Sequence, residues 1–178
     1  MRSALSAFVV AAVAATSPAH AQSPEPAAPA TAPMEFKIEG GQLVLPGPVV
    51  FETGSDKLAA ASDGVVKFIA AFLAAKDSIT LVRLEGHTDN EGEANAKVSL
   101  SLARALAVGR ALVAQGTDCK RLIVVGFGDF KPVAANDTPE NRALNRRIDV
   151  RPATLRGRPI GGMPVDGGAP TVGDVCSK

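Results

Sequence analysis

The chain has 178 residues and a nearly balanced charge, with 19 Lys+Arg against 18 Asp+Glu. Arg2 is the one charged residue among the first 21, and 18 charges of each sign remain without that segment. Binding to DNA or to an anionic membrane surface needs a basic excess, so this balance excludes those partners. Apolar residues make up 46% of the chain. Over roughly 150 positions this predicts one hydrophobic core with tails.

The first 21 residues resemble a secretory signal peptide. Met1-Arg2 is a short positive start, residues 4–15 are an apolar run, and Ala19-His20-Ala21 has the small residues of a cleavage site. We expect cleavage after Ala21 and export, with an uncleaved signal anchor as the alternative. The apolar run is shorter than the roughly 20 residues of a transmembrane helix. Gln22 would begin the mature chain, so neither a lipoprotein cysteine nor a direct membrane anchor is expected.

Two flanking segments differ in composition from the rest of the chain. Residues 22–46 are interpreted as a Pro/Ala-rich linker and lead-in, because 23–33 has no helical or strand period and suits an extended spacer. Residues 153–178 are rich in Gly and Pro, which predicts a poorly ordered C-terminal tail. The folded domain is therefore expected over residues 47–152.

Strand-like and helix-like patterns alternate between these flanks. Apolar residues three and four positions apart predict one helix over Leu58–Ala75 and a second around Val98–Val113, ended by Gly116. A short helix is expected near Glu140–Leu144. The predicted strands are Val49–Phe51, Ile79–Leu84, Leu122–Val125 and Ile148–Val150. The order β-α-β-α-β-(α)-β predicts an α/β (α+β) two-layer sandwich with helices packed on one face of a mixed sheet.

Several short motifs occur in the order and spacing of one known domain family. They are FETGS at 51–55, GHTDNEG at 86–92, LSLARA at 100–105, GFG at 126–128 with Pro132 and Asn136, and NRALNRR at 141–147. With these motifs, residues 47–152 resemble the OmpA-like peptidoglycan-binding domain of OmpA, Pal and MotB. The resemblance implies a non-catalytic periplasmic module without a cofactor, which binds the peptide stem of peptidoglycan.

The resemblance also implies a ligand and its site. The ligand is diaminopimelate, with Asp89 binding its ammonium, Arg104 its carboxylate, Thr88 assisting at the loop and Arg146 at the rim. Both charges of this ligand sit on one carbon, so its site needs an anion and a cation close together. The planar fork of Arg104 suits a carboxylate. Its helix position lies away from the buried stripe, which leaves it free to meet a ligand.

Other roles for these residues stay open. Asp89 and Arg104 could pair with each other as a partly exposed salt bridge. Arg146 and Arg147 would alternate between the faces of a strand, so one would point to solvent and both could be structural.

One residue departs from the family pattern. Lys97 stands where the family usually has Asn, and Asn95 lies two residues earlier. This departure favours an alternative function, an envelope scaffolding protein with weakened or absent wall binding. Its tail or linker would then dock another envelope protein, through which the chain would associate with the outer membrane.

Three further features have competing interpretations. His87 and Asp89 could hold a metal ion in a hydrolase, but no third ligand follows at a convincing spacing. Asn136 begins a glycosylation sequon, although turn chemistry explains it better. Cys119 and Cys176 are an even pair in a chain expected to be exported, so they could form a disulfide. Free thiols or an intermolecular bridge are the alternatives.

Overall fold

The computed structural model describes residues 34–165 and 169–177. The expected signal peptide and residues 22–33 of the expected linker lie outside these ranges. In the described part of the chain, no helix combines the length and apolar character needed to cross a membrane.

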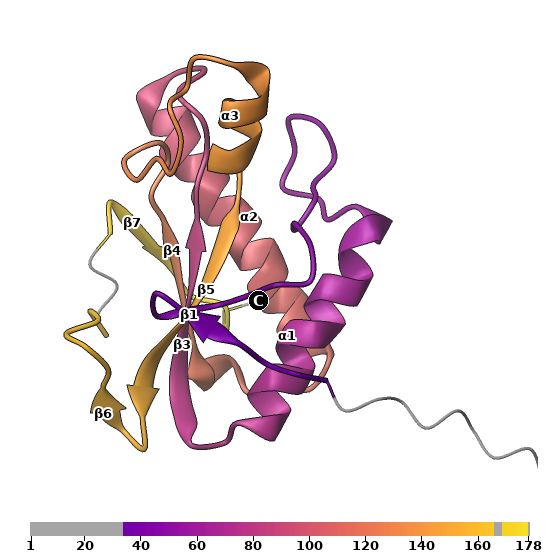
Figure 1. Ribbon diagram of the computed structural model, residues 1–178, viewed down its shortest axis with the longest axis vertical. Coiled ribbons are helices and arrows are strands. Elements are labelled where there is room, and N and C mark those ends of the chain that lie inside the picture. The colour runs from indigo at the N-terminus through magenta and orange to yellow at the C-terminus, as the bar shows by residue number, and fades with distance from the viewer. Residues whose placement is uncertain (1–33, 166–168, 178) are drawn as a thin grey trace, which may run out of the picture. The chain divides into compact units, whose positions relative to one another are not determined.

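A five-stranded sheet of order β6-β5-β3-β4-β7 forms the centre of the domain (Figure 1). β3 (Ile79–Gly86) runs parallel to β4 (Leu122–Gly126) and antiparallel to β5 (Ile148–Leu155). The edges are β6 (Arg158–Pro159), antiparallel to β5, and β7 (Thr171–Gly173), antiparallel to β4. The sheet is therefore mixed, and it confirms the predicted fold class.

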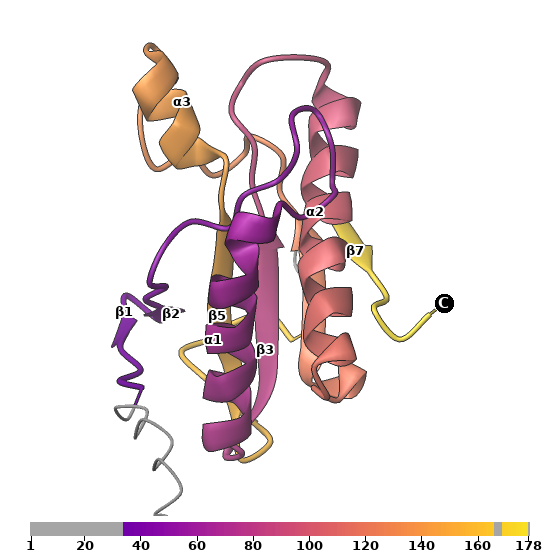
Figure 2. The same cartoon turned by 90° about the vertical axis from the view of Figure 1, so that its right-hand side faces the viewer.

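Helices α1 (Asp63–Ala75) and α2 (Ala94–Ala114) pack on one face of this sheet (Figure 2). α1 follows a 3-10 turn, η1 (Ala60–Ser62), and a second such turn, η2 (Cys119–Arg121), leads into β4. The predicted C-terminal end of α2 is confirmed, since Gly116 follows it in the left-handed region with φ +92°. The short helix α3 (Pro139–Asn145) connects β4 to β5.

The hydrophobic core lies between the sheet and α1 and α2. Even-numbered residues of the central strands face the helices, because successive strand side chains alternate between faces. These residues are fully buried together with inward residues of both helices: Val82, Leu84, Val124, Val150, Ile69, Phe72, Val108 and Leu112. Each such side chain stabilises the fold by about 1.5–3 kcal/mol relative to an exposed one.

Two glycines allow α2 to approach the ends of β3 and β4. A Cβ atom at Gly86 would overlap the carbonyl oxygen of Ser101, and one at Gly126 would lie 2.7 Å from the amide nitrogen of Leu102. Backbone therefore packs on backbone at this end of the sheet. The start of α2, helix α3 and the loop between β2 and α1 gather at the same end (Figures 1 and 2).

The N-terminal part of the described chain packs on the domain through a small hairpin. β1 (Ile38–Glu39) pairs with β2 (Gln42–Leu43), and Leu43 is fully buried in the core. The ring of Phe36 lies 5.1 Å from that of Phe68, measured between centroids. Part of the segment interpreted as linker and lead-in is thus structured.

The predicted strand at Val49–Phe51 is wrong. Phe51 forms only an isolated bridge with Leu58, and α1 begins at Asp63, after η1, rather than at Leu58. The Ser62 hydroxyl explains the difference, because it accepts a hydrogen bond from the Val50 N–H and donates one to the Val50 carbonyl. These backbone groups are thereby satisfied without a neighbouring strand.

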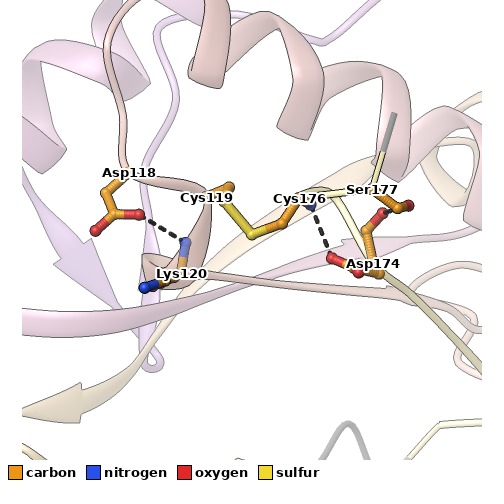
Figure 3. The surroundings of a disulfide bond; sticks show 6 residues. All are labelled: Asp118, Cys119, Lys120, Asp174, Cys176 and Ser177. Atoms are coloured by element: carbon orange, nitrogen blue, oxygen red, sulfur yellow. Dashed lines mark hydrogen bonds between the residues drawn. A yellow bond between two sulfur atoms is a disulfide. The ribbon is translucent and has the colours of Figure 1, made fainter.

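The prediction of a poorly ordered tail is also wrong for the described residues after 152. β5 continues to Leu155, β6 and β7 extend the sheet, and Val175 is buried in the core. A disulfide joins Cys119 at the start of η2 to Cys176 (Figure 3). The bridge and the packing of Val175 hold the segment in place, and composition alone does not reveal either contact.

Candidate functional site

A cavity of about 740 Å³ lies at the end of the sheet where β3 stops. Its walls are residues 48–54, the loop after β3, the first half of α2, and the end of α3 with the two residues after it. All four predicted ligand-binding residues line it, namely Thr88, Asp89, Arg104 and Arg146. Chain segments up to about a hundred positions apart therefore contribute to one space.

Asp89 stands three residues beyond the end of β3 and is largely buried. One oxygen, Oδ2, lies 2.7 Å from Nη1 of Arg146 in an ion pair. The other, Oδ1, accepts a hydrogen bond of 3.2 Å from the backbone N–H of Glu91. The ion-pair partner of Asp89 is thus Arg146, and the simple salt bridge considered between Asp89 and Arg104 is replaced by this pair.

Arg104 projects from α2 into the same cavity and is partly buried. Its Nε donates a hydrogen bond of 3.0 Å to the carbonyl oxygen of Ser55, and its guanidinium lies 5.1 Å from the ring centroid of Phe51. Burial and the charge of Arg146 lower the pKa of Arg104, and the charge of Asp89 opposes this shift. The loop at 51–55 therefore positions this side chain.

Arg146 and Arg147 precede β5 instead of lying in a strand, which corrects the prediction that they alternate across one. Arg146 ends α3 and points to Asp89, with 43% of its side chain exposed. Arg147 donates from Nε to Asp149 at 3.0 Å and from Nη2 to the carbonyl of Lys131 at 3.2 Å. Neither arginine is simply directed to solvent.

Thr88 is buried at the base of the cavity. Its backbone N–H donates to the carbonyl of Gly128 at 2.9 Å, which ties the loop after β3 to the loop after β4. Its hydroxyl has no hydrogen-bond partner among the described residues. A ligand group or a water molecule could satisfy this oxygen.

Lys97 has a structural role that sequence reasoning missed. Its Nζ lies 2.5 Å from Oδ2 of Asp129 and 3.3 Å from the carbonyl oxygen of Asn90. The side chain thus joins the loop after β3 to the loop after β4. Asn95, two residues earlier, is exposed. A loop aspartate such as Asp129 gives no sequence signal for this pairing.

Asn145 is the second residue that was missed, although it lies inside the NRALNRR motif. It is fully buried, and its Oδ1 accepts hydrogen bonds from the N–H groups of Val133 and Ala134. Its Nδ2 donates to Oδ1 of Asn136, which also accepts from the N–H of Asn90. Asn136 therefore organises the loop, as turn chemistry predicts.

A buried ion cluster lies on the sheet face opposite the helices. It consists of Arg83, Glu85, His87, Arg147, Asp149 and Arg151. Ligand atoms of Glu85, His87 and Asp149 lie within 4.8 Å of one another. Glu85 is already paired with Arg83 at 2.8 Å and Asp149 with Arg147 at 3.0 Å. Three arginines against two carboxylates leave positive charge, which does not fit a divalent cation.

His87 and Asp89 both line the cavity, but His87 also belongs to this buried ion cluster. The Nε2 of His87 lies 3.4 Å from Oδ2 of Asp149, and its ring stacks on Phe127 with centroids 5.4 Å apart. Asp89 pairs with Arg146 instead. The two residues considered as metal ligands therefore take different partners, which removes the geometric basis of the hydrolase interpretation.

The sequence model of the OmpA family matches residues 50–146, more than half of the chain. This chain belongs to the OmpA family. The peptidoglycan-binding protein ArfA of Mycobacterium tuberculosis is 34% identical over 125 residues, which are 70% of this chain and 38% of ArfA. The outer-membrane lipoprotein YfiB of Pseudomonas aeruginosa is 37% identical over 116 residues, which are 65% of this chain and 68% of YfiB.

Solved structures of the OmpA fold agree with this assignment. The peptidoglycan-associated lipoprotein of Burkholderia pseudomallei is 28% identical, with a TM-score of 0.54 over 58% of this chain and 86% of that one. The segment matching the OmpA family contains the cavity residues Asp89, Arg104 and Arg146. The hairpin β1–β2, strand β7 and Cys176 lie outside it.

Proposed function

We propose that this protein is a non-catalytic module that binds peptidoglycan through the diaminopimelate of its peptide stem. The observation that carries the proposal is the presence of one carboxylate, Asp89, and two guanidiniums, Arg104 and Arg146, in a single cavity. A carbon bearing both an ammonium and a carboxylate is complementary to this set. The names of ArfA and of the Burkholderia lipoprotein refer to peptidoglycan, which supports the polymer as the partner.

Each residue has a role in the proposed complex. Asp89 accepts the ammonium and Arg104 grips the carboxylate, while the Thr88 hydroxyl adds a hydrogen bond at the base and Arg146 acts at the rim. Because these groups are partly buried, charge-assisted hydrogen bonds to them are stronger than in open solvent. Such bonds contribute about 1.5–3 kcal/mol each.

The periplasm is the proposed location. Peptidoglycan is accessible there, and the disulfide between Cys119 and Cys176 suits an oxidising compartment. Export would rest on residues 1–21, outside the described part of the chain. Analysis of the mature N-terminus after expression with residues 1–21 present tests this, with a start at Gln22 expected.

A pull-down on purified sacculi tests the binding proposal. The wild type should be retained, and Asp89→Ala and Arg104→Ala should each reduce retention about tenfold or more, since each removes a hydrogen bond to a charged group. Arg110→Ala is the matched control, because Arg110 is an exposed arginine of α2 that does not line the cavity. Equal retention of all four proteins rejects the proposal.

The alternative is an envelope scaffold with the same fold and little wall binding. It is favoured by the ion pair that already occupies Asp89 and by Lys97 at the family's Asn position. Lys97→Asn distinguishes the two functions in the same pull-down. A scaffold should gain retention on sacculi, whereas a wall-binding module should gain none, because the contacts of Lys97 to Asp129 and Asn90 hold its loop.

A further inference from the structure

Arg146 is already paired with Asp89, the carboxylate that is proposed to accept the ligand ammonium. Its Nη1 lies 2.7 Å from Oδ2 of Asp89, the distance of a charge-assisted hydrogen bond. The other oxygen of Asp89 is engaged by the N–H of Glu91 at 3.2 Å. Each oxygen of Asp89 thus already has one donor, and a second cation has to share the carboxylate with Arg146 or displace it.

Arg146 is the partner that can move. Its side chain is 43% exposed and extends from the end of α3, whereas the Asp89 side chain is 10% exposed. Asp89 is also fixed by its hydrogen bond to the loop backbone. Because Arg146 is in contact with solvent, its guanidinium can be solvated by water once it leaves Asp89.

Formal charges show which ligands would gain from this exchange. Asp89, Arg104 and Arg146 together carry a net charge of +1. A ligand end group with only an ammonium raises this to +2 and leaves two guanidiniums without the Asp89 carboxylate. An end group with an ammonium and a carboxylate keeps the net charge at +1 and offers the guanidiniums an anion.

The remaining charged groups of the wall do not compensate for this difference. Four of these groups already have partners in ion pairs: Glu52 with Lys57 at 2.7 Å, Glu91 with Arg142 at 3.0 Å, Lys97 with Asp129, and Arg147 with Asp149 at 3.0 Å. Glu93 is exposed at the start of α2. The mutual repulsion of Arg104 and Arg146, which contributes to the lowered pKa of Arg104, is thus relieved chiefly by Asp89 or by a ligand carboxylate.

We infer that Arg146 is a specificity-determining residue, an internal substitute for the ligand ammonium that makes the cavity select a zwitterionic end group over a plain ammonium. This inference rests on the proposed function. It adds a physical reason why the cavity would reject a peptide stem that has lysine in place of diaminopimelate. Arg146 leaves Asp89 when the ligand binds and joins Arg104 near the ligand carboxylate. The family motif accounts for the presence of the arginine but not for this exchange.

Calorimetry with two synthetic stem peptides tests the inference. The peptides are L-Ala-γ-D-Glu-X, with X either meso-diaminopimelate or L-lysine, and the proteins are the wild type, Arg146→Gln and the control Arg110→Gln. Arg146→Gln should bind the lysine peptide about two- to fivefold more tightly than the wild type does, because its ammonium no longer displaces a guanidinium. The preference for the diaminopimelate peptide should narrow by at least that factor.

The outcomes separate the inference from the proposed function. In one outcome the wild type binds sacculi and the diaminopimelate peptide, while Arg146→Gln prefers diaminopimelate over lysine by the same ratio of affinities. That result overturns the inference but leaves the proposed function standing. If neither the wild type nor Arg146→Gln binds either peptide, the result overturns the inference and contradicts the proposed function. A complex solved with the diaminopimelate peptide should show Arg146 more than about 4 Å from Asp89. An intact pair in that complex overturns the inference.

Discussion

The ammonium of Lys97 lies 2.5 Å from the carboxylate of Asp129, and the two side chains are only 12% and 26% exposed. Lys97 also donates to the carbonyl of Asn90 at 3.3 Å. A residue of α2 therefore connects the loop after β3, which lines the cavity, to the loop after β4. The departure from the family's Asn thus adds a stabilising ion pair instead of leaving a gap.

This pair should be measurable by a double-mutant cycle. Lys97→Ala and Asp129→Ala should each destabilise the fold, with a coupling energy of about 1 kcal/mol, because the pair is partly buried but open to solvent. Urea unfolding of the two single variants and the double variant provides the measurement. Additive effects, with no coupling, would show that the two side chains do not interact.

Gly86→Ala should destabilise the protein by about 3 kcal/mol, because the added Cβ overlaps the backbone of Ser101 and α2 has to shift. Gly64→Ala is the control. Gly64 lies in α1 with no atom within 4 Å of an added Cβ, so alanine there should stabilise by about 0.5–1 kcal/mol. Thermal and urea unfolding compare the two, and similar effects of both variants would contradict close packing of α2 on β3.

The disulfide between Cys119 and Cys176 closes a segment with a sequence separation of 57. The chain-entropy relation assigns about 4 kcal/mol to a loop of this length. The variant with both cysteines changed to serine should be less stable by up to about this amount. Urea unfolding with and without reductant measures this loss of stability. Reductant should lower the stability of the wild type and leave that of the variant unchanged. A wild type insensitive to reductant would contradict the prediction.

Asp149 should make stability depend on pH. Burial alone would raise the pKa of Asp149, but the imidazole of His87, 3.4 Å away, and the charge of Arg147 outweigh burial and lower this pKa below its usual value. A carboxyl whose pKa is lower in the folded state stabilises the fold at higher pH, and the contribution is lost as pH falls through the folded pKa. Asp149→Asn should therefore be less stable than the wild type at neutral pH.

Urea unfolding at two pH values tests this prediction. The deficit of Asp149→Asn should shrink as the pH is lowered from neutral into the acid range, because protonation of the wild-type carboxyl removes its charge. Asp63→Asn is a control with an exposed aspartate at the start of α1. An equal deficit at both pH values would mean that the charge of Asp149 does not stabilise the fold.

Local patterns were enough to predict most of the fold. The period of apolar residues in α1 and α2 reflects burial of one helix face, and the short apolar runs of β3, β4 and the start of β5 reflect burial in a sheet. The strand predicted at 49–51 is wrong because a side chain, Ser62, satisfies backbone groups that strand pairing would otherwise use. Such a contact depends on a residue twelve positions away.

The motifs also indicated which residues line the cavity, because acidic and basic side chains in the GHTDNEG, LSLARA and NRALNRR segments share one end of the sheet. Their pairing could not be predicted. Asp89 could have bound Arg104, Arg146 or neither, and the sequence contains no measure of the distances that decide between them.

The sequence by itself determined the kinds of charge available to the site, the positions of the helices and central strands, and a core of one domain. Tertiary structure alone decided that Asp89 pairs with Arg146 across 57 positions, that Lys97 reaches Asp129 across 32, and that the Gly-rich tail is anchored. The physical reason is the distance along the chain over which each kind of interaction acts. Periodicity records burial within one element, whereas ion pairs and hydrogen bonds require side chains from separate elements within about 3–4 Å of each other.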